Sequence, residues 1–595
     1  MFFKRLGAAG NKTPTKRFPK TPLRRDATSL EQFIVEEIEI GDVRSPVAAI
    51  PLSRAKSSAG WSSIKSALAY TGLWLLLIMA TLFARTIWPV DETRLLAVAW
   101  EMWTRNEFVL PYLNGELFTR QPPLMPWLIH AGWGLLGVND WWPRLLPALF
   151  ALASLFVTGR LARLLWRDNL EISRFVPLVL VGTPLWAVYT SLALPDMLLA
   201  FFTLLGWWAV LIMWRHRDMR AFLLLGAALG LGALALGLVI YVYVLPVALL
   251  APLWGRGLYP IVWKYWYADV TKAILLGLAI LLLWLAPAAL HAGLPYALRW
   301  LYGSLIAARL DLLPAAQPWW WYLPWWPIVC LPWTIWPLLW LRLWHIRREP
   351  LSAGMNFCLI GTVATLVALS FIDVKQPQFL LPLLPLAALF VSHLLLDESL
   401  GKLGQDTMLG GMTIPIVVLG GVLAILPKLP RVEFLPGPLW ELSPFVGIGI
   451  MIAGIALAWI PGREIRRRAV DIIIAGTLLV VFATLGVGWQ FDSRHQLDAV
   501  GRFLATAQAQ HRPIAHVGDY QGEFQFSGRL LEPLQTITPD QAESWSATRP
   551  HGMLVSFTHI WQPRGADTMR PALETAHRGL TLRIWYAGVD PVQHP

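Results

Sequence analysis

The sequence predicts an all-α polytopic membrane protein of about 13 transmembrane helices, followed by a small C-terminal α/β domain outside the membrane. Three observations predict this fold class. Of 595 residues, 56% are hydrophobic and only 14% are charged, whereas a soluble protein carries about 25% charged residues. The mean hydropathy is +0.52. The apolar residues also come in blocks of about 20, the length that crosses a hydrocarbon core as a helix.

Residues 1–65 differ from the rest of the chain. They hold twelve Lys or Arg and six Asp or Glu, and they contain no apolar run long enough for the hydrophobic part of a signal peptide. We therefore expect a basic, largely disordered cytoplasmic tail. A topology anchor that touches anionic lipid is favoured over a specific binding module.

Residues 66–489 are expected to form the transmembrane domain. Gly237 is the expected break in a nearly continuous apolar stretch. Cys330 and Cys358 both fall in apolar runs, so no disulfide framework is expected. The expected spans are 66–88, 143–162, 174–194, 197–214, 221–236, 238–254, 273–290, 320–341, 354–372, 378–396, 410–427, 443–460 and 470–489.

The basic residues orient these spans. With thirteen spans, every strongly basic short loop falls on the side of the N-terminal tail, including "RHRDMR" at 215–220 and "GREIRRR" at 462–468. Cytoplasmic loops attract Lys and Arg, so this side is expected to face the cytoplasm of an inner-membrane protein. The outer side then holds the loop 89–142 and the C-terminal segment 490–595.

The C-terminal segment 490–595 is much less apolar than the spans. Its short mixed stretches "RPIAHVGDY" and "GMLVSFTHI" have the pattern of strands. We therefore expect a small α/β domain on the outer face. The 34 Trp residues include the cluster "WWWYLPWW" at 319–326. An interfacial aromatic belt is the favoured interpretation, and stacking on carbohydrate or lining of a lipid groove is the alternative.

The first outer loop opens with two adjacent acids, Asp91 and Glu92, directly after an apolar run. Apolar residues from Leu95 to Trp103 recur at helical spacing, which predicts an amphipathic helix lying in the membrane interface. Asp91 would then be its N-cap. The local sequence leaves open whether the acids serve as a cap or in a functional site.

Further polar residues fall on the same outer side, where charges are costly and therefore candidates for function. Together they predict one cavity with acids on one wall and cations on another. Cations suit a phosphate, and a carboxylate suits a hydroxyl or a sugar. The candidates are Asp196 in "SLALPDMLLAFF", Arg120 and Gln121 in "GELFTRQPPL", Arg299 and Arg309 in the loop 291–318, and Lys375 in "DVKQPQFLLPLLP".

These motifs resemble those of the GT-C superfamily of polyprenyl-phosphate-sugar glycosyltransferases, in particular the 4-amino-4-deoxy-L-arabinose lipid A transferase and protein mannosyltransferase group. The resemblance runs from about residue 70 to 490. It is most specific in "DETRLLAVAWEMWTRNEFVLPYLNGELFTRQPPLMPWL", in "GVNDWWPRLLPALF" (137–150) and in "KQPQFLLPLLPLAALF" (375–390). It implies a GT-C-like transmembrane fold.

The resemblance also implies roles for residues. Asp91 matches the catalytic carboxylate of the first loop, Glu92 its companion and Asp196 a second acidic position. Lys375 matches a cation near the donor phosphate. Two positions depart from the family pattern: Gln121 stands where a Lys usually precedes Pro-Pro, and Leu236 stands where a Lys often follows the fifth span. Both missing lysines are expected to touch phosphate, so an altered donor, a different acceptor and a weakened enzyme all remain open.

The resemblance implies transfer of a sugar, with inversion, from a polyprenyl-phosphate donor to a lipid A-like lipid, glycan or protein acceptor at the outer membrane face. Asp91 would act as base or position the acceptor, and Arg120 and Lys375 would hold the phosphate, with membrane lipids around the site. No cofactor and no nucleic-acid partner are expected, and a divalent-metal requirement and the oligomeric state are left open. The alternatives are a catalytically degenerate lipid-binding relative and a transporter, although the acids lie at span ends and no internal repeat is evident.

Overall fold

The computed structural model describes most of the chain beyond the N-terminal tail. Contact clustering separates Met1–Gly60 from Trp61–Pro595, and the description below concerns the second unit. The predicted tail up to residue 62 and Arg309 lie outside the described residues. Those residues are 63–84, 90–216, 220–255, 262–306, 317–347, 350–372, 375–397, 410–429, 443–459, 465–492, 497–564, 566, 570–577 and 580–587.

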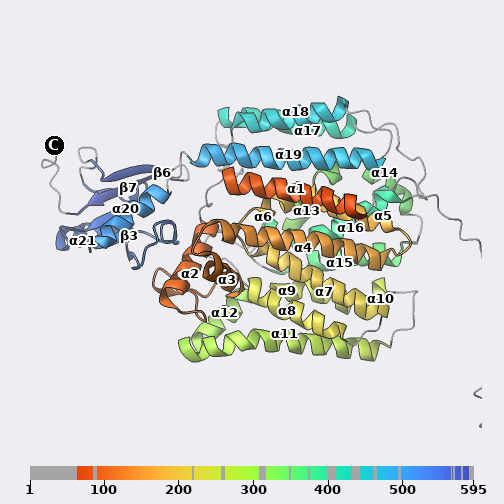
Figure 1. Ribbon diagram of the computed structural model, residues 1–595, viewed down its shortest axis with the longest axis horizontal. Coiled ribbons are helices and arrows are strands. Elements are labelled where there is room, and N and C mark those ends of the chain that lie inside the picture. Colours follow the sequence, from red (N-terminus) through yellow and green to blue (C-terminus); the bar gives the residue numbers. More distant parts are fainter. Residues whose placement is uncertain are drawn as a thin grey trace, which may run out of the picture. The chain divides into compact units, whose positions relative to one another are not determined.

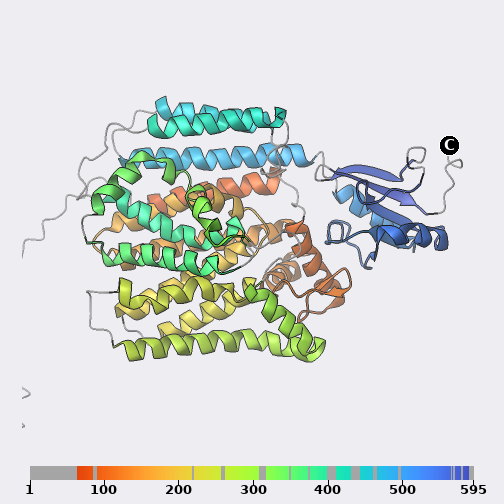
Figure 2. The same cartoon turned by 180° about the vertical axis from the view of Figure 1, so that it is seen from behind.

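Long apolar helices run side by side through this unit (Figures 1 and 2). Among the described residues, seven are long and apolar enough to cross a membrane, or eight if one bent pair counts as a single span. The chain is therefore a multi-pass helical membrane protein, but the predicted count of 13 spans is not confirmed. The seven comprise α1 (Ser63–Ala84), α4 (Trp141–Leu165), α7 (Asp196–His216), α11 (Trp263–Ala292), α15 (Ala353–Ser370), η3 with α16 (Pro377–Leu383 and Leu384–Leu396) and α19 (Ile465–Asp492).

The other expected spans are helical but shorter or broken. Proline explains several breaks because it lacks the N–H that the helix ladder needs. Pro184 starts α6 after a bend of 72°, and four prolines divide 319–346 into short pieces. These elements are α5 (Leu170–Val181), α6 (Pro184–Thr190), α8 (Ala221–Leu236), α9 (Val239–Leu249), α10 (Ala251–Trp254), η1 (Trp319–Trp321), α13 (Tyr322–Val329), η2 (Trp333–Ile335), α14 (Pro337–Ile346), α17 (Gly410–Ile425), η5 (Leu426–Lys428) and α18 (Pro444–Trp459).

Gly237 separates α8 from α9, as predicted. Its φ is +89°, a conformation that glycine adopts without the steric cost other residues incur. Its N–H bonds to the Ala233 carbonyl and closes α8. A Cβ at this position would also lie 2.9 Å from Cβ of Ser304, so the turn packs closely against α12 (Leu294–Ile306).

The segment after α1 folds into α2 (Asp91–Arg105), a two-stranded hairpin of β1 (Tyr112–Leu113) and β2 (Glu116–Leu117), and α3 (Leu124–Leu136). The predicted helix after the acidic pair is confirmed, but its predicted environment is wrong. Every residue from Glu92 to Met102 is buried in protein, so α2 is not an amphipathic helix at a lipid surface. Asp91 is not the N-cap either, because Val90 occupies that position without a side-chain cap.

The C-terminal region forms a five-stranded sheet, ordered β4-β3-β5-β7-β6. Strand β3 pairs in parallel with β4 and β5, and β7 pairs antiparallel with β5 and β6. Strands β3 and β5 lie in the two stretches where strands were predicted. The elements are α20 (Leu497–Ala509), β3 (Ile514–Val517), β4 (Gln535–Ile537), η7 (Pro539–Gln541), α21 (Ala542–Thr548), β5 (Met553–Phe557), β6 (Leu573–His577) and β7 (Leu580–Tyr586).

Candidate active site

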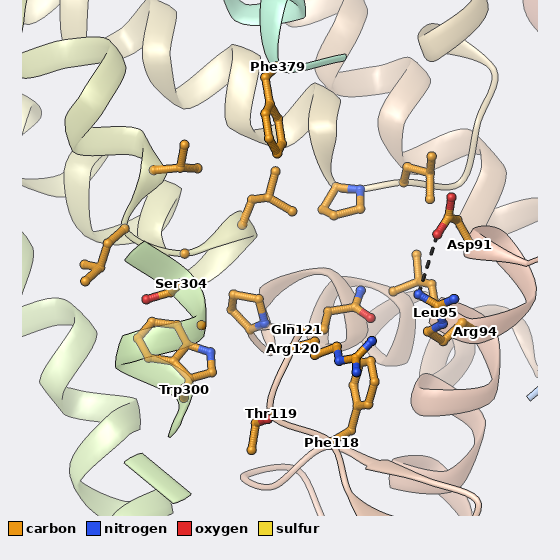
Figure 3. A pocket seen from close by; sticks show the side chains of 18 of the residues that line it. Asp91, Arg94, Leu95, Phe118, Thr119, Arg120, Gln121, Trp300, Ser304 and Phe379 are labelled. Atoms are coloured by element: carbon orange, nitrogen blue, oxygen red, sulfur yellow. Dashed lines mark ion pairs between the residues drawn. The ribbon is translucent and has the colours of Figure 1, made fainter. Parts of the chain in front are cut away.

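A cavity lies where the start of α2, the loop after β2, the α8–α9 turn and α12 meet (Figure 3). It encloses about 1080 Å³ between its lining atoms, part of which is open to solvent. Small-molecule sites commonly occupy about 300–1,000 Å³, so a sugar-sized group fits here. The lining residues are Asp91, Arg94, Leu95, Phe118, Thr119, Arg120, Gln121, Pro122, Leu194, Pro195, Leu236, Gly237, Leu238, Val239, Val242, Trp300, Gly303, Ser304, Ile372 and Phe379.

The first turn of α2 supplies a carboxylate and a guanidinium. Nη1 of Arg94 lies 3.6 Å from Oδ1 of Asp91, and a dashed line marks this ion pair in Figure 3. The Asp91 side chain is 47% exposed, whereas that of Arg94 is only 7% exposed. Asp91 is therefore accessible to a ligand while Arg94 is held in place beside it. Sequence reasoning did not select Arg94, although its i,i+3 spacing from Asp91 was a usable signal.

The loop after β2 supplies a second cation. Arg120 and Gln121 both line the cavity, and Figure 3 shows them between Asp91 on one side and Trp300 on the other. Desolvation by the surrounding protein lowers the pKa of the Arg120 guanidinium from its usual value, but an arginine stays charged in proteins. The Pro122–Pro123 pair then starts α3, as predicted, with Pro123 at the N-cap.

The remaining wall is mostly apolar. It includes the α8–α9 turn from Leu236 to Val239, together with Val242, Ile372 and Phe379. Leu236 and Gln121, the two positions at which the resembled family has lysine, therefore line the same cavity. The cavity thus keeps arginine cations but has neutral side chains at both lysine positions.

Three predicted site residues lie behind the cavity wall and do not line it. The Glu92 side chain accepts a 2.5 Å hydrogen bond from the backbone N–H of Ala193, next to the lining residue Leu194. Asp196 starts α7 and is 3% exposed. Nζ of Lys375 is equally buried and donates to the carbonyls of Ile372 at 2.7 Å and Gln317 at 2.9 Å. Of the five residues expected around one cavity, Asp91 and Arg120 line it.

The two remaining candidates behave differently. Arg299 is exposed on α12 and does not line the cavity, although the next residue, Trp300, does. Successive helical residues are turned by about 100°, which explains the difference. Arg309 lies outside the described residues. Within the part of the chain that is described, no group of three or more His, Cys, Asp or Glu side chains could hold a metal ion.

The chemical character of the cavity follows from these walls. A partly exposed carboxylate can accept a proton or orient a hydroxyl. Guanidinium groups bind phosphate oxygens through charge-assisted hydrogen bonds. Apolar side chains and Trp300 offer surface for a hydrocarbon or for the face of a sugar. The combination suits an amphiphilic ligand that carries phosphate.

Comparisons with known proteins agree with the resemblance seen in the sequence. Residues 120–291 match the family model described as dolichyl-phosphate-mannose-protein mannosyltransferase. The undecaprenyl phosphate-alpha-4-amino-4-deoxy-L-arabinose arabinosyl transferase of Pseudomonas aeruginosa strain UCBPP-PA14 is 28% identical over 366 residues, which cover 60% of this chain and 64% of the relative. A second enzyme of that name, from Pseudomonas fluorescens strain Pf0-1, is 26% identical and covers 80% of this chain and 89% of the relative.

The fold is shared with a solved structure. The crystal structure of ArnT from Cupriavidus metallidurans bound to undecaprenyl phosphate superposes with a TM-score of 0.68. The match covers 89% of this chain and 99% of that chain at 19% sequence identity. The chain is thus confirmed as similar to polyprenyl-phosphate-sugar glycosyltransferases and has an ArnT-like fold. The match to the first Pseudomonas aeruginosa relative spans just under two thirds of its length.

Proposed function

We propose that this chain, similar in sequence to aminoarabinose transferases and sharing the ArnT fold, is an integral-membrane glycosyltransferase. It transfers one sugar from a polyprenyl-phosphate donor to an acceptor at the outer face of the cytoplasmic membrane. The observation that carries this proposal is the cavity in which Asp91 faces two arginines and an apolar wall. That set of groups matches the three parts of the donor: a sugar, a phosphate and a hydrocarbon chain.

In the proposed reaction, an acceptor oxygen attacks the anomeric carbon of the sugar. The bond from that carbon to the phosphate oxygen breaks, the electron pair leaves with the polyprenyl phosphate, and the configuration inverts. If the acceptor is a hydroxyl, its proton passes to the Asp91 carboxylate, which is exposed enough to meet it. If the acceptor is already an anionic phosphate, Asp91 positions the sugar and takes no proton.

Two arginines are assigned to the leaving phosphate. Arg94 and Arg120 come from different elements but line one cavity, so both can reach phosphate oxygens. Neutralising charge there matters because an uncompensated charge is costly in a low-dielectric groove. Lys375 is assigned a different part, because its ammonium group is used by two backbone carbonyls. It holds the segment that carries the lining residue Ile372.

The acidic residues behind the wall are assigned to its shape. Glu92 fixes the backbone of Ala193 and thereby the turn that presents Leu194 and Pro195 to the cavity. Asp196 follows directly and starts α7. The named relatives use undecaprenyl phosphate-linked 4-amino-4-deoxy-L-arabinose, which makes this compound the first donor to test, with lipid A as first acceptor.

A transfer assay tests the proposal. The purified full-length protein in lipid nanodiscs is supplied with lipid A and with undecaprenyl phosphate carrying radiolabelled 4-amino-4-deoxy-L-arabinose. We expect the label to move to lipid A and undecaprenyl phosphate to be released in equal amount. If no label moves to lipid A, or to glycan or protein acceptors from the same membranes, and the donor stays intact, the proposal is wrong.

A further inference from the structure

A segment of the C-terminal domain is bound to the elements that build the cavity. This segment, residues 522–534 between β3 and β4, is called the clamp segment below. Nε1 of Trp100, on α2, donates a 2.8 Å hydrogen bond to the carbonyl of Leu530. Asn114, at the turn of the β1–β2 hairpin, forms two hydrogen bonds with the backbone of Leu534: Nδ2 donates to its carbonyl at 2.8 Å, and Oδ1 accepts from its N–H at 2.7 Å.

The clamp segment also packs closely against α2. Gly522 has a φ of +81°, and a Cβ placed there would lie 2.7 Å from Cβ of Ala97. The backbone therefore approaches α2 more closely than a residue with a side chain would permit. Arg529 lies over the rings of Trp100 and Phe526, 5.3 and 3.8 Å from their centroids. Hydrogen bonds and close packing thus act on the same helix.

The two clamped elements carry opposite parts of the cavity. Helix α2 starts with Asp91 and Arg94, and the hairpin leads directly into the loop that carries Arg120. A buried carboxylate links the two elements to each other, because Oε1 of Glu101 on α2 accepts from the N–H of Gly115 in the hairpin turn at 2.8 Å. The clamp segment holds both members of this pair from the outside.

We propose that the clamp segment is a positioning element for the transfer reaction. It fixes α2 against the hairpin and so fixes the separation of the Asp91 carboxylate from the Arg120 guanidinium across the cavity. The inference rests on the proposed function and adds a role for the C-terminal domain. None of the lining residues among those described comes from 522–534, so the segment acts through α2 and the hairpin and not by touching substrate.

Positioning predicts a particular kinetic result. The apolar wall that would bind the donor chain comes from α8, α9 and η3, which the clamp segment does not hold in the contacts above. Loosening the clamp should therefore leave donor affinity nearly unchanged. It should lower kcat, because misplacing a catalytic group by about 1 Å can cost roughly a hundredfold in rate.

Asn114 allows a clean substitution. Its φ is +53°, so Asn114→Gly keeps the backbone geometry and removes both side-chain hydrogen bonds to Leu534. We expect kcat to fall roughly tenfold to a hundredfold, with KM for the donor within about threefold of wild type. Asn114→Asp keeps the acceptor for the Leu534 N–H and should restore part of the rate. Trp100→Phe, which removes only the donor to Leu530, is the second variant and should lower kcat in the same way.

The matched control is Asn106→Gly. Asn106 has the same φ of +53° but is exposed at the C-cap of α2, away from the clamp segment. Its variant should transfer sugar at the wild-type rate. Hydrogen exchange at the amides of 92–97 and 118–121, compared between wild type and Asn114→Gly, measures the hold of the clamp without any substrate. Exchange should be faster in Asn114→Gly.

The outcomes separate the two proposals. An active wild type with unchanged kcat in both Asn114→Gly and Trp100→Phe overturns the clamp. So does a lower yield of folded protein with unchanged kcat per folded molecule, because that result describes a structural role only. An inactive wild type overturns the proposed function and the catalytic role of the clamp with it, and unchanged hydrogen exchange overturns the clamp whether or not transfer is seen.

Discussion

Trp133 of α3 and Phe526 of the C-terminal domain stack on each other, with 5.4 Å between ring centroids and 3° between ring planes. Both side chains are buried in the same apolar core as the membrane helices. Trp100 and Trp103 meet Trp133 edge to face. Aromatic pairs of this kind contribute about 0.5–1.5 kcal/mol beyond the area they bury. The C-terminal domain is therefore joined to the helical region through a shared core.

Removing this ring should weaken the whole protein. Phe526→Ala leaves a cavity beside Trp133 and Trp100, and we expect the free energy of unfolding to fall by about 3–5 kcal/mol. Chemical denaturation of the protein in detergent, followed by Trp fluorescence, measures the change. The control is Leu531→Ala in the same segment, because Leu531 is 73% exposed and should change stability by less than about 0.5 kcal/mol. Equal effects of the two would contradict the shared core.

Neutralising Asp91 should abolish most transfer. Asp91→Asn keeps the size of the side chain but removes the carboxylate that accepts a proton or orients the acceptor. We expect kcat to fall at least about a hundredfold, with little change in thermal stability, because the ion pair with Arg94 is long and half exposed. Asp140→Asn is the control: Asp140 pairs with Arg144 at 2.9 Å and does not line the cavity. A wild-type rate for Asp91→Asn would remove Asp91 from the mechanism.

Removing Arg120 should weaken binding of the donor. A hydrogen bond to a charged group contributes about 1.5–3 kcal/mol, so Arg120→Ala should raise KM for the donor roughly tenfold or more. Arg299→Ala is the matched control, since Arg299 is exposed and does not line the cavity. Steady-state kinetics over a range of donor concentrations gives both values. The same KM for the two variants would show that Arg120 does not contact the phosphate.

Restoring a lysine should strengthen the donor site. Gln121→Lys adds an ammonium group to a cavity that has neutral side chains at both lysine positions of the family. We expect KM for the donor to fall about threefold to tenfold, because each added charge-assisted contact is stronger than a neutral one. Gln510→Lys, at an exposed position of the C-terminal domain, controls for the change in net charge. An unchanged or higher KM for Gln121→Lys would indicate a donor that this cavity binds without a lysine.

The C-terminal domain should lose stability in mild acid. Burial lowers the pKa of His516 below its usual value. Nδ1 bonds to the Gly518 carbonyl at 3.1 Å, and Nε2 is buried without a partner among the described residues. The unfolded chain therefore binds a proton near pH 6.5 while the folded chain does not. Stability is complete above about pH 6.5 and falls as the pH drops below that value towards the lowered folded pKa.

His516→Asn tests this pH dependence, because an asparagine amide can still donate to Gly518 but does not titrate. The loss of thermal stability between pH 7 and pH 5.5 should be smaller in His516→Asn than in wild type. His551→Asn, at an exposed histidine, should behave like wild type. Thermal unfolding at several pH values measures all three proteins, and an identical pH dependence for wild type and His516→Asn would contradict the assignment.

Several features could be predicted from the sequence because they depend on local chemistry. Hydropathy was enough for a multi-pass helical protein, and the glycine at 237 was enough for the break between α8 and α9. Alternating patterns predicted the positions of β3 and β5. Asp91 and Arg120 were selected from their place in one loop, and both line the cavity.

Other features depended on contacts that no local pattern reveals. The periodicity of α2 predicted one apolar face, but the clamp segment covers a second face, so the helix is buried. The sequence placed Glu92 and Lys375 correctly near the site but did not indicate that backbone groups of Ala193, Ile372 and Gln317 bind them. Span counting took apolar runs as continuous helices, whereas prolines break several of them.

The bonds between Asn114 and Leu534 also constrain the order in which the molecule is completed. The hairpin turn is synthesised early, and its partner emerges only after all the intervening helices have been made. Contacts so distant along the chain form late and slowly. During synthesis, the carboxylate-bearing helix therefore waits without its final support while the membrane helices insert. The reaction centre becomes competent only when the last domain has folded, so an unfinished chain in the membrane carries the cavity residues without the geometry to use them.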